Sequence, residues 1–219
     1  MKKTALLRIL GLNVFMLLST VGYCQILSWQ FALPEPSTGK DRSANSTTNN
    51  ENLEQAVLTR GPGAIAKQGN LRGFSGNFPV NATKEDAKKS GAYYQFTVKA
   101  KKGYKVSLSS LNALLRRQAE SAHIYRWMYS LDGKDFKEIG NEDVVINDLN
   151  NTGIQQPQIN LSAYQDLQDV PSSKTITFRI YAWGGISDKG TQIAFGFGKS
   201  NSKGSPVLAV SGNVETEKK

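Results

Sequence analysis

The most regular alternation of side chains in the sequence lies in residues 123–139, HIYRWMYSLDGKDFKEI. An extended strand points successive side chains to opposite faces, and one face of this segment carries Tyr125, Trp127, Tyr129 and Leu131. Asp132-Gly133 then interrupts the alternation, because glycine accepts the positive φ of a tight turn without a clash. The segment therefore predicts a β-hairpin in which residues 136–139 fold back on the strand, and with it an antiparallel β fold.

The two faces of this strand differ in the free energy of burial. Each aromatic ring gains on the order of 2 kcal/mol by leaving water, whereas a buried arginine without a partner is strongly unfavourable. We therefore predict that the aromatic face points inward, while Arg126, Met128 and Ser130 point outward. The expected inner partners are Tyr94, Phe96, Val98, Ile176, Phe178 and Ile180.

Short strand-like segments separated by glycine-rich or polar turns cover most of the remaining chain. They lie at residues 26–32, 56–59, 93–98, 104–109, 144–146, 158–161, 174–183, 192–197 and 206–214. The alternation shifts near Ser110-Leu111, which predicts a β-bulge, and residues 84–89 and 163–167 are typical of single helical turns. The pattern predicts an all-β fold, a two-sheet antiparallel β-sandwich of jelly-roll or Greek-key type, and leaves the strand order open.

The first residues are typical of a secretory signal peptide. Lys2, Lys3 and Arg8 precede an apolar run at residues 9–18, which is too short for a permanent membrane span of about 20 residues. Tyr23 is too bulky for an acylation signal at Cys24, so we expect a cleaved leader of residues 1–24 and an unlipidated mature chain without cysteine. This predicts a protein that is secreted, periplasmic or at the cell surface, with no transmembrane segment after processing.

The rest of the chain is expected to form one domain, residues 25–214, followed by a charged tail at 215–219. After Pro34 and Pro36, the sequence is mostly Ser, Thr, Asn and charged residues. We expect residues 33–52 to form a mobile loop.

The formal net charge is +9, and without the three leader cations 24 basic residues against 18 acidic residues leave +6. Lysines gather at Lys99, Lys101, Lys102 and Lys105, and at Lys84, Lys88 and Lys89. Such clusters could meet an acidic polysaccharide, a lipid headgroup or nucleic acid. Apart from Tyr104 they lack interleaved aromatics, which favours solvated turns and argues against a nucleic-acid partner.

Catalytic groups are sparse. His123 is the sole histidine, which excludes a site with two histidine ligands and is typical of a surface residue. Glu85-Asp86 and Glu142-Asp143 are neighbours in sequence, so extended chains would point them apart. We expect no enzyme and no cofactor; Asp143, Asn147 and Asp148 leave a structural calcium site open, although no loop has EF-hand spacing.

Several segments resemble a known group of proteins. They are Trp29-Gln30-Phe31, residues 58–63 (LTRGPG), residues 129–133 (YSLDG), residues 177–181 (TFRIY) and a glycine-rich closing strand pair. Together, from about Trp29 to Gly212, they resemble galactose-binding-like jelly-roll modules of secreted Bacteroidetes-type proteins. The resemblance implies a β-sandwich that accompanies enzymes or surface proteins and in some cases binds carbohydrate.

The strand at residues 174–183 supplies the predicted ligand site. If Ile176, Phe178 and Ile180 point inward, strict alternation places Arg179, Tyr181 and Trp183 in one outward stripe. Such a stripe could bind a glycan or cell-surface polymer through ring faces and the arginine fork. Two alternatives stay open: a structural or adhesive surface protein in which a loop covers these residues, and a glycan-active jelly-roll enzyme.

Overall fold

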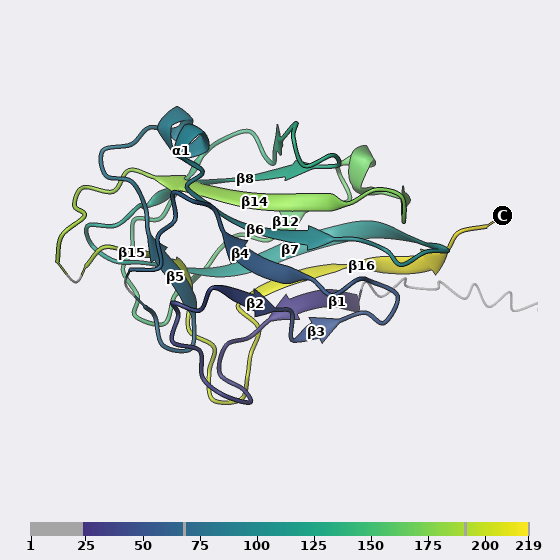
Figure 1. Ribbon diagram of the computed structural model, residues 1–219, viewed down its shortest axis with the longest axis horizontal. Helices are drawn as coiled ribbons and strands as arrows, with labels where there is room; N and C mark the ends of the chain where they lie inside the picture. Colours follow the sequence, from purple (N-terminus) through teal and green to yellow (C-terminus); the bar gives the residue numbers. More distant parts are fainter. Residues whose placement is uncertain (1–23, 68, 191, 219) are drawn as a thin grey trace, which may run out of the picture.

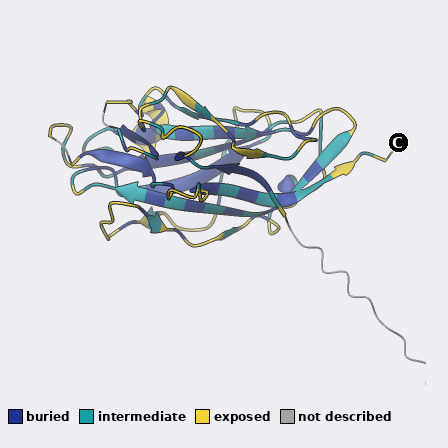
Figure 2. Ribbon diagram, turned by 90° about the horizontal axis from the view of Figure 1, so that it is seen from below, coloured by how far each residue is buried: buried dark blue, intermediate teal, exposed yellow. Residues whose placement is uncertain are grey.

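The computed structural model describes residues 24–67, 69–190 and 192–218. These residues form two antiparallel sheets, one nine-stranded and one seven-stranded, stacked as two layers (Figure 1). Buried residues lie between the layers, and exposed residues follow the loops and the strand ends (Figure 2). The predicted all-β, two-sheet sandwich is confirmed.

The first sheet is organised around one long strand, β7. Its order is β3 (Thr48–Asn49), β1 (Cys24–Trp29), β16 (Leu208–Thr216), β7 (Tyr104–Arg117), β15 (Ala194–Phe197) and β5 (Phe74–Asn77). The short strands β11 (Ile154–Gln155), β12 (Ile159–Asn160) and β13 (Val170–Pro171) also pair with β7.

The second sheet contains the predicted hairpin. Its order is β10 (Val144–Val145), β8 (Ile124–Ser130), β14 (Ile176–Trp183), β6 (Tyr93–Val98), β4 (Val57–Arg60) and β2 (Ser43–Asn45). Strand β9 (Lys137–Glu138) returns after Gly133, whose φ is +73°, and pairs with β8 through Met128 and Tyr129. The hairpin prediction is confirmed.

The inner face of the second sheet is the predicted core. Phe178 on β14 lies between Phe96 on β6 and Tyr129 on β8, and Ile180 lies between Tyr94 and Trp127. The Trp127 and Phe96 rings pack edge to face with centroids 6.2 Å apart. The aromatic residues of β8 and the expected inner partners on β6 and β14 are all buried, and Leu131, which follows β8, is partly buried.

The outer face of β8 differs from the prediction, because Arg126, Met128 and Ser130 are buried as well. The chain between β8 and β10 folds back over this face, and Arg126 Nη2 donates to Gly140 O and lies 2.8 Å from Glu138 Oε2. Burial alone would raise the pKa of Glu138, but the hydrogen bond from Lys84 and the charge of Arg126 hold it below its ordinary value. The alternation rule failed here because the arginine has partners that sequence spacing does not reveal.

The predicted helical turn at residues 84–89 is helix α1 (Lys84–Ser90). Thr83 and Asp86 form a capping box at its start, and Gly91, with φ +70°, ends it in the left-handed conformation. The second predicted turn is a 3-10 helix, η1 (Gln165–Leu167). Both predictions are confirmed.

The predicted bulge is also present. The pairing of β7 with β16 runs from Ser110 opposite Ser211 to Leu108 opposite Gly212, so Ser109 has no partner residue on β16. Residues 106 and 108 point inward before the bulge, and 111, 113 and 115 point inward after it. One extra residue therefore keeps both halves of a 14-residue strand facing the core.

Two boundaries were wrong. Residues 33–52, expected to be a loop without regular structure, contain β2 and β3, and the expected tail begins inside β16, which continues to Thr216. The expected leader lies outside the described residues except for Cys24, which begins β1. Within the described part of the chain, no helix has the length and apolar character to cross a membrane.

Candidate functional site

The predicted stripe of Arg179, Tyr181 and Trp183 is not exposed. The Arg179 guanidinium lies between two rings, 4.1 Å from the centroid of Tyr93 and 4.0 Å from that of Phe136. Its Nε donates to Gln95 Oε1 at 2.7 Å, and its Nη1 donates to the Tyr181 hydroxyl at 3.1 Å. Arg179 is therefore occupied by groups of the chain itself.

The two aromatic members of the stripe are covered too. Tyr181 is 5% exposed and packs edge to face on Tyr93, and Trp183 is 6% exposed with Lys84 Nζ 5.8 Å from its ring centroid. A ring needs an open face to take a sugar. The prediction of an exposed aromatic platform is wrong, because the chain between β8 and β10 and helix α1 form a further layer over this face.

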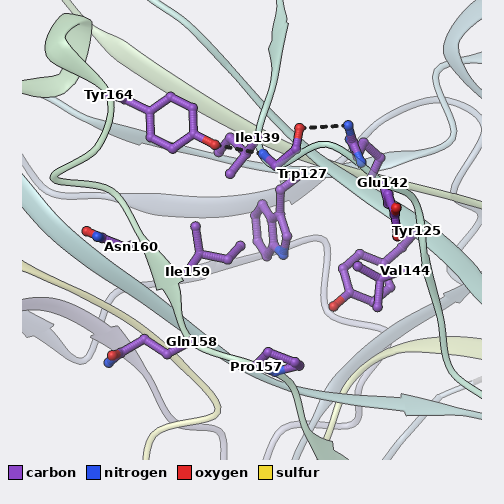
Figure 3. A pocket seen from close by; sticks show the side chains of 12 residues that line it. Tyr125, Trp127, Ile139, Glu142, Val144, Pro157, Gln158, Ile159, Asn160 and Tyr164 are labelled. Carbon is purple, nitrogen blue, oxygen red and sulfur yellow. Dashed lines mark hydrogen bonds between the residues drawn. The ribbon is translucent and has the colours of Figure 1, made fainter.

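An open site lies instead on the inner face of β8, where the edges of the two sheets separate. A cavity of about 260 Å³, here called the first cavity, is lined on one side by Tyr125 and Trp127 and on the other by residues 157–160 next to β12. The connection from β9 to β10, residues 139–144, forms a third wall. Figure 3 shows the Trp127 indole standing between Ile159 and the pair Tyr125 and Val144.

Two phenols tie the walls of the first cavity together. The Tyr125 hydroxyl donates to Gln156 Oε1 at 3.0 Å, and the Tyr164 hydroxyl accepts from the Gly140 backbone N–H at 2.7 Å (Figure 3). Burial raises the pKa of the Tyr125 phenol, which therefore stays protonated as a donor. These bonds join the first sheet's side of the cavity to the second sheet's side, so the opening is held at a fixed width.

The mouth of the first cavity has free polar groups. Glu142, Gln158 and the Asn160 Nδ2 group have no protein partner among the described residues. The indole N–H of Trp127 has no acceptor among the described residues either. An apolar wall with a few free donors and acceptors is the usual composition of a small-molecule site.

A second cavity, of about 350 Å³, follows along the same strand and is lined by Tyr129, Asp132, Asp166, Lys137 and Lys174, among others. The Tyr129 ring packs edge to face on Tyr164, which lines the first cavity. Lys137 hydrogen-bonds Asp166 and thereby lowers the pKa of that carboxyl, while burial and the Asp166 charge raise the pKa of Tyr129. The second cavity is thus lined by more charged residues than the first, in which Arg126 and Glu142 are the charged members.

The other candidate groups do not come together. His123 lies at the start of β8, and Glu85 and Asp86 lie in the first turn of α1. Asp143, a candidate calcium ligand, is 2.7 Å from Lys84 Nζ and 3.7 Å from Arg126 Nη1. Among the described residues, no group of three or more His, Cys, Asp or Glu side chains is placed to hold a metal ion.

The sequence predicted Trp127 as a core residue and did not indicate the cavity beside it. The alternation of β8 placed the ring inward, which is correct, yet it cannot show that the two sheets separate beside that ring. No sequence pattern indicated that Gln158 and Asn160 belong to a site, since they lie in a polar segment with a two-residue strand. Only the path of the chain brings them opposite β8.

No family model matches the sequence, and no curated protein matches it significantly. Among solved structures, the C-terminal domain of a chitobiase from Bacteroides fragilis is similar over 83% of this chain and 100% of that domain. The sequence identity is 15% and the TM-score is 0.28.

Proposed function

We propose that the chain is an exported, non-catalytic module of galactose-binding-like type that binds carbohydrate, with a sugar unit at the mouth of the first cavity. The supporting observation is a cavity between the two sheets whose mouth carries the free polar groups of Glu142, Gln158 and Asn160. The hydroxyls of a sugar need donors and acceptors such as Glu142, Gln158 and Asn160, and its C–H groups suit the apolar lining residues.

The arrangement along β8 favours an oligosaccharide over a single sugar. Trp127 and Tyr129 are two residues apart on the same face, which separates them by roughly 7 Å along the strand. A chain of two or more sugar units could therefore reach from the first cavity to the second. Hydrolysis normally requires two carboxyl groups flanking the bond. In the second cavity Asp166 pairs with Lys137 and Asp132 is held by the turn after β8, which favours binding over catalysis.

A glycan array with the purified protein, followed by calorimetry on the best ligand, tests this function. We expect the double substitution Gln158→Ala with Asn160→Ala to weaken binding about tenfold, because each lost hydrogen bond is worth about 0.5–1.5 kcal/mol. Both side chains are exposed, so the melting temperature should stay within about 1 °C.

The matched control is Asn151→Ala with Gln192→Ala, two exposed amides that line neither cavity. It should bind as the unmodified protein does. An array without any bound glycan would favour a structural or adhesive role instead. Hydrolysis of the bound glycan over hours would show an enzyme, and equal weakening in both double variants would place the sugar elsewhere.

A further inference from the structure

A third cavity lies against the connection between β15 and β16 and shares no lining residue with the two cavities beside β8. Its volume is about 490 Å³. Its walls come from the turn before β5, the turn before β11 and residues 199–207, a segment near the yellow end of the colour scale in Figure 1. We call it the Arg72–Lys199 cavity after its two charged residues.

Both cations in this cavity lack a counter-charge. Arg72 and Lys199 are half-buried, no Asp or Glu lines the cavity, and neither side chain has a partner among the described residues. Elsewhere Lys84, Lys105 and Lys137 each pair with a carboxylate. A partly buried cation without a partner loses hydration with no compensation, and a concave surface of one charge sign concentrates ions of the other sign.

Backbone hydrogen bonds fix the points from which the two cationic side chains leave the chain. Ser200 N–H donates to Arg72 O at 2.8 Å, and Lys199 N–H donates to Thr152 O at 2.7 Å. Asn201 accepts from the backbone N–H groups of two residues further along the same connection, which orders it. Hydrogen bonds therefore already hold the backbone at both residues, so ligand binding would not have to pay the entropy cost of ordering this segment.

The backbone conformation of Arg72 is a third observation. Three described residues other than glycine have positive φ: Arg72 at 61°, Asn81 and Asp169. Asparagine and aspartate tolerate this region, whereas arginine is unusual there and glycine would adopt it freely. A residue held in an unfavourable backbone conformation at a cavity is a reason to look for a ligand there.

We propose that the Arg72–Lys199 cavity binds an oxyanion carried by an acidic polysaccharide, either the carboxylate of a uronic acid or a sulfate ester. The arginine fork can bind two oxygens of one such group, and lysine adds a point charge. Hydroxyls of Thr152, Ser202 and Ser205 in the lining suit the neighbouring sugar. No aromatic ring lines the cavity, which disfavours single-stranded nucleic acid, since bases stack on rings. This proposal does not depend on the first cavity.

Binding of the purified protein to polygalacturonate, dextran sulfate and neutral dextran, measured at 0.15 M salt, tests the proposal. At that ionic strength charges screen beyond about 8 Å, so diffuse attraction is weak. We expect binding to polygalacturonate, dextran sulfate or both, and at least tenfold weaker binding for R72Q/K199Q. The matched control K101Q/K102Q removes the same charge from two exposed lysines that line no cavity described here and should change binding less than twofold.

Arg72→Gly gives a second measurement that does not depend on tolerance of glutamine at positive φ. It should lose the acidic polymer while melting at the same temperature or higher, because glycine relieves the backbone. Binding to polygalacturonate alone would identify the bound group as a carboxylate, and binding to dextran sulfate would identify it as a sulfate ester. The proposal is overturned if R72Q/K199Q and K101Q/K102Q weaken binding equally, if no acidic polymer binds, or if a single-stranded oligonucleotide binds more tightly. R72Q/K199Q should leave unchanged the binding of any glycan that depends on Gln158 and Asn160. The proposals for the two cavities are therefore tested independently.

Discussion

Trp127 contributes to both the core and the first cavity. One edge of its ring packs on Phe96, and another part faces the opening between the sheets. The side chain as a whole is 3% exposed, so most of its surface serves the core. A substitution here must therefore be read for stability before it is read for binding.

We expect Trp127→Ala to lower the free energy of unfolding by roughly 3–5 kcal/mol, because the lost ring leaves a cavity that the rigid sheets cannot fill. Urea denaturation measures this loss. Trp127→Phe keeps a ring against Phe96 and should lose much less, while removing the indole N–H from the first cavity. A melting temperature that changes by only a degree in Trp127→Ala would mean that the ring packs outside the core.

Asp132 makes the turn after β8 sensitive to acid. Its Oδ1 accepts the backbone N–H groups of Lys134 and Asp135 and the Ser130 hydroxyl, and these bonds lower its pKa to about 2. A carboxyl with a lowered pKa stabilises the fold fully above its unfolded pKa of about 3.9, and this contribution disappears as the pH falls toward 2.

We therefore expect the unfolding free energy of Asp132→Asn to depend less on pH between about 4 and 2 than that of the unmodified protein. The amide keeps an oxygen acceptor but has no proton to gain in this range. Denaturation curves at several acidic pH values give the comparison. Asp148→Asn is the control, since Asp148 is exposed and accepts no hydrogen bond among the described residues, and its acid dependence should follow the unmodified protein.

Among the elements, β7 and β16 depend on a close approach at the bulge. A Cβ atom on Gly212 would lie 2.3 Å from Ser107 O, which is backbone and cannot move away as a side chain could. The register change between Ser211 and Gly212 lies at this point. Glycine is required here because the sheet has no room for a Cβ atom.

Gly212→Ala should lower the free energy of unfolding by roughly 1–3 kcal/mol, because the two central strands of the first sheet must separate locally. Thermal denaturation measures it. Gly103→Ala is an informative comparison: Gly103 has φ +87° but open space around its Cβ position, so it should lose about 1–2 kcal/mol from backbone strain alone. If Gly212→Ala is neutral, the bulge can move along β7.

The elements that have a strong local sequence pattern were predictable. The surfaces that a distant part of the chain covers were not. The Asp132-Gly133 turn, the helical turn at residues 84–89 and the shift near Ser110 each express a local steric or hydrogen-bonding rule, and each is present. The two-residue strands β11 and β13 have no such sequence pattern, because they are extended only through their pairing with β7. Arg179 was assigned to the surface because alternation specifies a face, whereas Phe136, which covers it, arrives from another part of the chain.

At the scale of the whole molecule, the ends of the described chain meet. Strand β16 lies between β1 and β7, so the last strand fills the centre of the first sheet and pairs with the first strand along most of its length. Leu208 and Val210 on β16 are fully buried. Pairing between distant segments makes folding slow and leaves the sheet incomplete until β16 is in place.

A chain that ends at Val207 should therefore fail to fold cooperatively. Without β16, the inner edges of β1 and β7 have unpaired backbone groups, and the core loses Leu208 and Val210. Circular dichroism with thermal denaturation should show no sharp transition. A synthetic peptide of residues 206–217 should restore one, because a strand can be added to an open sheet in trans. The control ends at Glu217, which retains the bond from Ser172 N–H to Glu217 Oε1, and should melt as the full chain does. A sharp transition in the chain ending at Val207 would mean that β1 and β7 can close the first sheet without β16.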